Sequence, residues 1–185
     1  MSELRRRIIN SPLDKVFKHE GGYQANKEDT GNYNSAKELV GTNFGISAKV
    51  YEDYLGRSVT ASDMKKMTKD EARLIYSKNY IPAVVRNLGV PENSELFPQV
   101  LDLVVNHGYG NASKIINGLV LNDPNDNKSG PKTRAAIQLA MKEPKKFNNN
   151  LVQARLGFYN DIIKSKPDNK KYLKGWTNRA KSYSS

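Results

Sequence analysis

Residues 95–107, ELFPQVLDLVVNH, are apolar on nearly every side of the helix that they would form, and Gly108 follows them directly. A helix that is apolar all round is typically buried, so this segment predicts a central helix of about 13 residues. Further helical patterns fit residues 111–121, 131–141, 145–165 and 171–182. The 185 residues are within the range of one globular domain with a substantial core. The sequence therefore predicts a mainly α fold.

A short amphipathic helix is expected near the N-terminus. Ser11-Pro12 supplies a capping hydroxyl followed by proline at the first helical position, and Gly21-Gly22 supplies the stop. Leu13, Val16 and Phe17 recur between them at helical spacing. Glu20 is then the last helical residue, at the rim of the surface on which the helix packs, where a carboxylate is partly desolvated.

Residues 23–46 have no helical period and are rich in glycine and asparagine, which predicts a loop or a small irregular β-hairpin. A helix is expected to begin at Ser47 and to end at Gly56. The capping-box pattern Thr68-Lys-Asp-Glu71 predicts another helix through Tyr80. The expected architecture is thus helical with one small irregular or β lobe near the N-terminus.

Several kinds of chemistry are disfavoured by composition. The chain has no cysteine and only two histidines, which excludes disulfides, thiolate catalysis and cysteine-ligated metals. His19-Glu20 lacks the second histidine of a zinc-protease motif, because position 23 is Tyr23. The acidic stretch that begins at Asp123 has Lys128 where a calcium loop needs glycine, so a turn is the better interpretation. We expect neither a metal nor a cofactor.

No apolar run is long enough to span a bilayer, and the residues before Ser11 show no apolar core of a signal peptide. We expect a soluble chain made in a cytoplasm, without stable membrane insertion. Its 30 Lys and Arg against 19 Asp and Glu give a net charge of +11, which attracts polyanions such as nucleic acid, anionic lipid or bacterial wall. The basic residues are spread along the chain rather than clustered with aromatics, which argues against nucleic acid.

Glu20 and Asp29 are the two carboxylates that suggest a reaction. The Gly21-Gly22 turn would let Asp29 fold back toward Glu20, and glycoside hydrolysis uses such a pair, one carboxyl protonated and the other ionised. On spacing alone, however, a solvated surface pair is the more frequent arrangement of two such carboxylates.

The order of several motifs carries more information than this spacing. His19-Glu-Gly-Gly-Tyr23, Asp29-Thr-Gly31 and Gly41-Thr-Asn-Phe-Gly-Ile46 resemble glycoside hydrolase family 108, lysozyme-like N-acetylmuramidases of bacteriophages and bacteria. The resemblance continues in a predicted peptidoglycan-binding region with the Gly130-Pro-Lys-Thr133 turn and the Gly175–Arg179 ending. It implies a lysozyme-like fold, with residues 1–95 as the catalytic region and residues 96–185 as a helical peptidoglycan-binding-like region packed with it.

The resemblance further implies that Glu20 is the catalytic acid. Asp29 would be the second carboxylate, and Thr42 or Ser35 the hydroxyl that holds the water. The chain departs from the family pattern in the additional residues 32–40, which leaves Glu38 as another candidate for the second carboxylate. For substrate binding we expect Tyr23, Asn106 and Tyr109.

The function that follows is hydrolysis of the β-1,4 bond between N-acetylmuramic acid and N-acetylglucosamine. We expect a monomeric phage endolysin that is made in the host cytoplasm, is released by a partner such as a holin and acts on the cell wall in the periplasm. Two alternatives remain: a lytic transglycosylase that uses Glu20 alone, and a non-catalytic protein that binds cell wall or nucleic acid.

Overall fold

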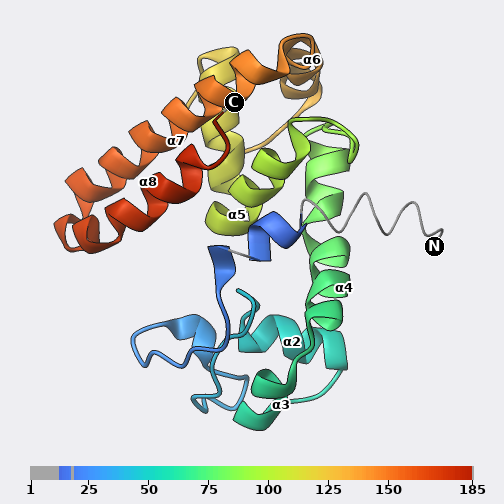
Figure 1. Cartoon of the computed structure of the whole chain (residues 1–185), viewed down its shortest axis with the longest axis vertical. Helices are drawn as coiled ribbons and strands as arrows, with labels where there is room; N and C mark the ends of the chain where they lie inside the picture. Colours follow the sequence, from blue (N-terminus) through green and yellow to red (C-terminus); the bar gives the residue numbers. More distant parts are fainter. Residues whose placement is uncertain (1–12, 18, 185) are drawn as a thin grey trace. The chain divides into compact units, whose positions relative to one another are not determined.

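The computed structural model describes residues 13–17 and 19–184, and it consists of two compact units that divide between Asn79 and Tyr80. Both units are built mainly from helices, so the predicted fold class is confirmed (Figure 1). The helix start expected at Ser11 and Pro12 lies outside the described residues. None of the helices within the described ranges has the length and the apolar character that crossing a membrane requires.

The first unit begins with helical residues 13–17 and 19–20. Gly21 follows with φ of +72°, so the helix ends at Glu20 as the sequence predicted. The next residues form an irregular lobe with one short 3-10 helix, η1 (Thr30–Asn32). Isolated antiparallel bridges close this lobe, and they pair Gln24 with Thr42, Tyr33 with Leu39 and Asn43 with Ile46. The expected small, irregular β-like lobe is therefore present.

Three helices complete the first unit. In α2 (Ala48–Leu55), Ser47 caps the first turn and Gly56 ends the helix with φ of +69°, as predicted. The α4 helix (Lys69–Asn79) begins at the predicted capping box, in which Thr68 and Glu71 exchange hydrogen bonds of 2.7 to 3.2 Å. The sequence pattern did not indicate α3 (Ala61–Lys66), a single short helix with one fully buried apolar side chain.

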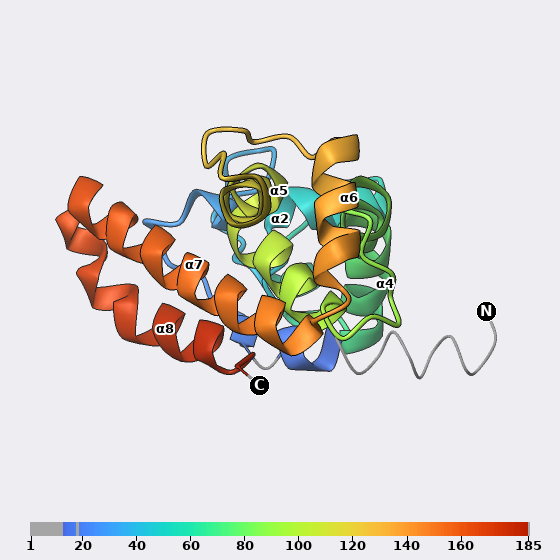
Figure 2. The ribbon, with the colours of Figure 1, turned by 90° about the horizontal axis from the view of Figure 1, so that it is seen from above.

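The second unit is organised around the buried helix α5 (Phe97–Leu121). Gly108 interrupts it with φ of 73° and ψ of 160°, so the segment consists of two helices that meet at a kink, where the sequence predicted a helix end. The unit begins with a π-helical turn, η2 (Ala83–Asn87). After α5 it continues through α6 (Pro131–Ala140), α7 (Pro144–Ser165), η3 (Pro167–Tyr172) and α8 (Leu173–Lys181). Figures 1 and 2 both show α7 and α8 side by side.

A buried cluster of charges joins the helices of this second unit. Asp102 on α5 accepts hydrogen bonds from Arg155 Nη2 on α7 at 2.7 Å and from Arg179 Nε on α8 at 2.9 Å. Asp102 and Arg155 are completely buried. Burial acts to raise the pKa of Asp102, but the two guanidinium groups outweigh it and hold the pKa below its usual value. Each charge thus depends on the presence of the others.

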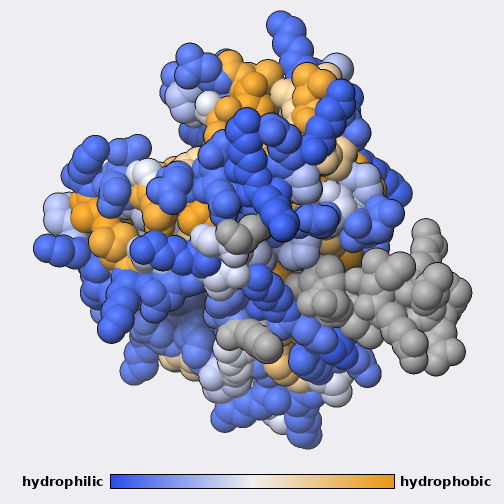
Figure 3. Space-filling view, turned by 45° about the horizontal axis from the view of Figure 1, so that its top comes forward, coloured by the Kyte–Doolittle hydropathy of each residue, from blue (hydrophilic) through white to orange (hydrophobic). Residues whose placement is uncertain are grey.

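The surface of the molecule is predominantly polar. The face seen in Figure 3 is mostly hydrophilic, with apolar side chains in small separate groups. Within the described residues, Leu74, Leu139 and Tyr172 are the large apolar side chains that remain exposed. Such scattered apolar exposure is ordinary for a globular protein.

Candidate active site

Glu20 lies against the tip of the hairpin that the Gly41–Ile46 segment forms. Its carboxylate is so close to the Cα of Gly45 that a Cβ added there would overlap Glu20 Oε2 and would lie 2.9 Å from Glu20 Cδ. The same Cβ would lie 2.8 Å from the hydroxyl oxygen of Tyr76. Glu20 is half-buried, as the sequence predicted for the end of this helix. Glycine at position 45 therefore provides the space in which the carboxylate lies.

The hairpin tip is a two-residue turn between Asn43 and Ile46, whose backbone groups exchange hydrogen bonds of 3.2 and 2.8 Å. Phe44 and Gly45 occupy its centre with φ of 50° and 70°, the combination typical of a type I′ turn. A left-handed conformation is unfavourable for phenylalanine, so other contacts must hold the turn in place.

Two side-chain hydrogen bonds fasten this turn to the rest of the first unit. The Tyr76 hydroxyl on α4 donates to the Phe44 carbonyl at 2.8 Å, and Asn43 Nδ2 donates to the Met64 carbonyl on α3 at 2.8 Å. Phe17 packs edge-on against Tyr76, with ring centroids 5.1 Å apart. The position of Glu20 thus depends on three elements: its own helix, α3 and α4.

Gln24 is the centre of a hydrogen-bond network that joins the predicted residues Asp29 and Thr42. Its Nε2 lies 3.1 Å from Asp29 Oδ2, 2.9 Å from Thr42 Oγ1 and 3.1 Å from Asn32 Oδ1. Its Oε1 accepts from Asn32 Nδ2 at 2.9 Å and from the Asn26 backbone N–H at 2.8 Å. No sequence motif indicated Gln24, although its bridge to Thr42 joins the two sides of the lobe.

Asp29 and Thr42 keep hydrogen-bonding capacity beyond this network. Asp29 Oδ1 accepts from the Gly31 N–H at 2.9 Å and caps η1, so each carboxylate oxygen has one protein donor and can accept a second one. The Thr42 hydroxyl accepts from Gln24, which leaves its own hydrogen for donation to another acceptor. Asp29 is exposed and Thr42 is 9% exposed.

Ser35 and Glu38, the alternatives to Thr42 and Asp29, take part in other contacts. Ser35 donates to the buried Glu52 carboxylate through both its hydroxyl and its backbone N–H, each at 3.0 Å. Burial acts to raise the pKa of Glu52, but the hydrogen bonds that it accepts outweigh burial and lower that pKa. Glu38 accepts from Asn34 Nδ2 at 2.9 Å within its own turn.

Tyr23 contacts the lobe through both its ring and its hydroxyl. The hydroxyl donates to the Val40 carbonyl at 3.1 Å, and the ring packs so closely on Gly41 that a Cβ there would lie 2.6 Å from it. Lys65 Nζ lies 5.2 Å from the ring centroid. A ring face is therefore what Tyr23 has to offer to a ligand.

Asn106 and Tyr109 belong to the second unit and lie on either side of the Gly108 kink. Asn106 Nδ2 lies 3.1 Å from His107 Nε2, which is also 3.2 Å from the Tyr159 hydroxyl. Burial, with a contribution from the charge of Arg155, lowers the pKa of His107 to about 4, so the imidazole is neutral at pH 7. The Tyr109 hydroxyl accepts from the Ser129 backbone N–H at 3.3 Å.

No three His, Asp or Glu side chains of the described residues are grouped closely enough to hold a metal ion. The first unit places Glu20 against a rigid turn and holds a carboxylate and a hydroxyl, those of Asp29 and Thr42, through one glutamine. Such a set can donate a proton and hold a water molecule.

Two family models match consecutive parts of the chain. The family model described as glycosyl hydrolase 108 matches residues 13–108, and the model described as a predicted peptidoglycan domain matches residues 117–181. Among solved structures, SagA of Brucella abortus is similar, with 27% sequence identity and a TM-score of 0.70 over 96% of this chain and 92% of SagA. The search of curated proteins gave no significant match.

Proposed function

The chain belongs to the glycosyl hydrolase 108 family and is a glycoside hydrolase that acts on peptidoglycan, and from this premise we propose that it is an N-acetylmuramidase with Glu20 as its general acid. The resemblance seen in the sequence is confirmed by the two family matches in the expected order. The bond that we assign is the β-1,4 linkage between N-acetylmuramic acid and N-acetylglucosamine.

The observation that carries this assignment is the contact between the Glu20 carboxylate and Gly45 in a turn that is fastened on two sides. A general acid must be held at one place relative to the leaving oxygen, because proton transfer needs hydrogen-bond distance. Glu20 gives its proton to the glycosidic oxygen, and positive charge develops on the sugar ring as the bond breaks.

Asp29 and Thr42 then serve the water that completes the hydrolysis. Asp29 stabilises the positive charge or orients the water through its remaining lone pairs, while the Thr42 hydroxyl donates a hydrogen bond to that water. The water oxygen bonds to the anomeric carbon, and the proton that the water releases passes to a carboxylate, either Asp29 or the deprotonated Glu20. Gln24 orients both groups through one amide nitrogen. Tyr23 offers a ring face to the sugar. Asn106 and Tyr109, which belong to the second unit, are proposed to bind sugar within that unit.

Mass spectrometry of the fragments from purified peptidoglycan tests the assignment. Wild type is expected to release fragments with reducing N-acetylmuramic acid ends. Glu20→Gln should lower the rate by about 10²- to 10⁴-fold, the usual contribution of general acid–base catalysis. Glu28→Gln is the matched control, because Glu28 is an exposed carboxylate of the same lobe. Equal rates for Glu20→Gln and Glu28→Gln would contradict the role of Glu20.

Asp29→Asn separates hydrolysis from lytic transglycosylation. A muramidase that uses Asp29 should lose most of its rate, whereas a transglycosylase tolerates the change and releases 1,6-anhydro ends. If wild type released anhydro ends, the reaction would be lytic transglycosylation instead of hydrolysis, and Glu20 would keep its role as the catalytic acid. Binding of wild type to peptidoglycan without any fragment would favour the non-catalytic alternative.

For the biological role we propose a phage endolysin that a holin releases from the host cytoplasm. The net charge of +11 supports this role, because it concentrates the chain on the anionic envelope. Expression in a Gram-negative host should cause lysis only when a holin is expressed with it. Lysis without the holin would contradict the release step.

A further inference from the structure

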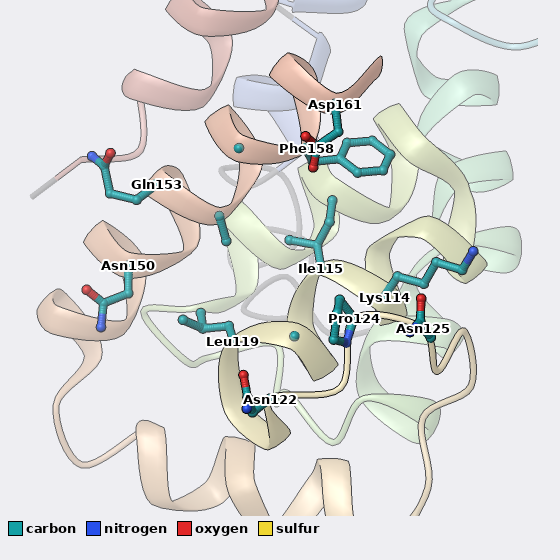
Figure 4. Close-up of a pocket in the computed structure, with 13 residues that line it drawn as sticks. Lys114, Ile115, Leu119, Asn122, Pro124, Asn125, Asn150, Gln153, Phe158 and Asp161 are labelled. Atoms are coloured by element: carbon teal, nitrogen blue, oxygen red, sulfur yellow. The ribbon is translucent and has the colours of Figure 1, made fainter. Parts of the chain in front are cut away.

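The second unit contains a groove of about 710 Å³ between the second half of α5, the loop that follows it and α7 (Figure 4). This volume is within the range of binding sites for small ligands, roughly 300 to 1,000 Å³. All but two of its lining residues lie within the segment that matches the predicted peptidoglycan domain. None of the residues assigned to the reaction above lines it.

The groove has an apolar middle and a polar rim. Apolar side chains from both helices and the loop form the middle, and these are Ile115, Leu119, Pro124, Ala154 and Phe158. Figure 4 shows the polar ends of the labelled side chains toward the edges. Four carboxamides lie there, those of Asn122, Asn125, Asn150 and Gln153.

Carboxamides outnumber charged side chains at the rim, although the chain as a whole carries +11. Lys114 and Asp161 are its charged residues, one of each sign, and Asp161 pairs with Lys164 at 3.2 Å. The rim therefore offers a ligand mainly carboxamide groups. Carboxamides both donate and accept hydrogen bonds, so they complement hydroxyl and acetamido groups.

Gly157 lines the groove in the middle of α7. No atom lies within 4 Å of the position that a Cβ would take there. Packing of the protein therefore does not require glycine, although glycine weakens the interior of a helix. Gly118 differs, because a Cβ there would lie 3.3 Å from Pro124.

We propose that the α5–α7 groove binds the glycan strand of peptidoglycan, with an acetamido methyl group in the apolar middle and the rim carboxamides bonded to hydroxyl and amide groups. The choice of peptidoglycan rests on the proposed function, whereas the place of binding rests on the groove itself. The second unit thus holds the uncharged sugar backbone rather than the charged peptide stem.

Nuclear magnetic resonance tests this placement with a defined probe. Isotope-labelled Glu20→Gln chain is titrated with the β-1,4-linked tetramer of N-acetylglucosamine. The side-chain amide signals of Asn122, Asn150 and Gln153 should shift and saturate. Adding Gly157→Gln, which extends a side chain into the groove, should weaken this binding at least tenfold. Adding Gly175→Gln should leave it unchanged, because Gly175 lies in α8 outside the groove and a Cβ there also meets no atom.

Gly157→Ala checks that loss of binding does not come from unfolding. A Cβ at this position meets nothing, so the thermal midpoint should rise. Groove signals that shift with a synthetic stem tetrapeptide and not with the sugar tetramer would overturn the proposal. Equal binding by Gly157→Gln and Gly175→Gln would also overturn it.

The experiments distinguish failure of the groove proposal from failure of the proposed reaction. Signal shifts confined to residues 13–79 would show that the groove does not bind the glycan, and the role assigned to Glu20 would be unaffected. If the groove signals shifted and saturated but wild type released no fragments from peptidoglycan, glycan binding by the groove would be supported and the proposed reaction would be contradicted.

Discussion

At the scale of single residues, Gly45 has the most direct influence on the candidate acid. An alanine there would need φ of +70° and would place its Cβ on Glu20 Oε2. We expect Gly45→Ala to lose about 1 kcal/mol of unfolding free energy from its backbone and at least about tenfold in kcat. Gly56→Ala is the matched control, since Gly56 has φ of +69° and open space around it. Denaturant unfolding should show similar losses of stability for Gly45→Ala and Gly56→Ala. The rate of fragment release should fall for Gly45→Ala alone.

Gln24 offers a second test at this scale. Gln24→Leu keeps the approximate shape of the side chain but removes the donor that Asp29 and Thr42 share. We expect kcat to fall about tenfold with KM nearly unchanged, and stability to fall by about 1 to 3 kcal/mol because polar partners lose their hydrogen bonds. Gln138→Leu removes an exposed hydrogen bond to Gly89 in the other unit and should leave kcat unaltered. A fall in stability without any fall in kcat would show that Gln24 only supports the fold.

The sequence revealed Glu20 more readily than Gln24, for a physical reason. Glu20 has a local signature, because a helix with apolar spacing ends there at two glycines. The hydrogen-bond partners of Gln24 are 5, 8 and 18 residues away in the sequence. They come together only after the irregular lobe has folded. The residue motifs of the lobe carried the family resemblance, but no periodic pattern shows which polar side chain will lie at the centre.

At the scale of elements, helix boundaries were predicted best where a cap or a glycine marks them. The segment ends at Ser47, Gly56 and Thr68 agree with the structure because the capping hydrogen bonds are local. The α3 helix was missed, since six residues give too short a window for apolar periodicity. Its capping box uses Thr60 and Asp63, whose side chains satisfy the first turn.

The kink in α5 gives the prediction at this scale. Gly108 has φ of 73° and ψ of 160°, a region that is essentially restricted to glycine. Gly108→Ala should therefore destabilise the second unit by about 1 to 3 kcal/mol. Gly110→Ala, two residues further in the same helix, should be neutral or stabilising, because a Cβ there meets no atom. Thermal unfolding of both variants checks this, and equal midpoints would mean that the kink is not maintained by Gly108.

At the scale of the whole molecule, His107 links stability to pH. Its pKa is about 4 in the fold against 6.5 for the free side chain, so the unfolded chain binds more protons between these values. The unfolding free energy should fall as the pH drops, by about 2 kcal/mol between pH 7 and pH 5. His107→Gln should remove this slope, as measured by denaturant unfolding at the two pH values. If the unfolding free energy of His107→Gln still depended on pH in the same way, the dependence would come from groups other than His107.

The buried cluster of Asp102, Arg155 and Arg179 also affects the order in which the two units fold during synthesis. Asp102 meets its two partners 53 and 77 positions later, so it lacks them until α7 and then α8 have left the ribosome. The first unit contains both partners of its Gln24, Asn43 and Tyr76 hydrogen bonds. During synthesis the first unit can therefore fold around Glu20 before α8, which completes the charge cluster of the second unit, has been made.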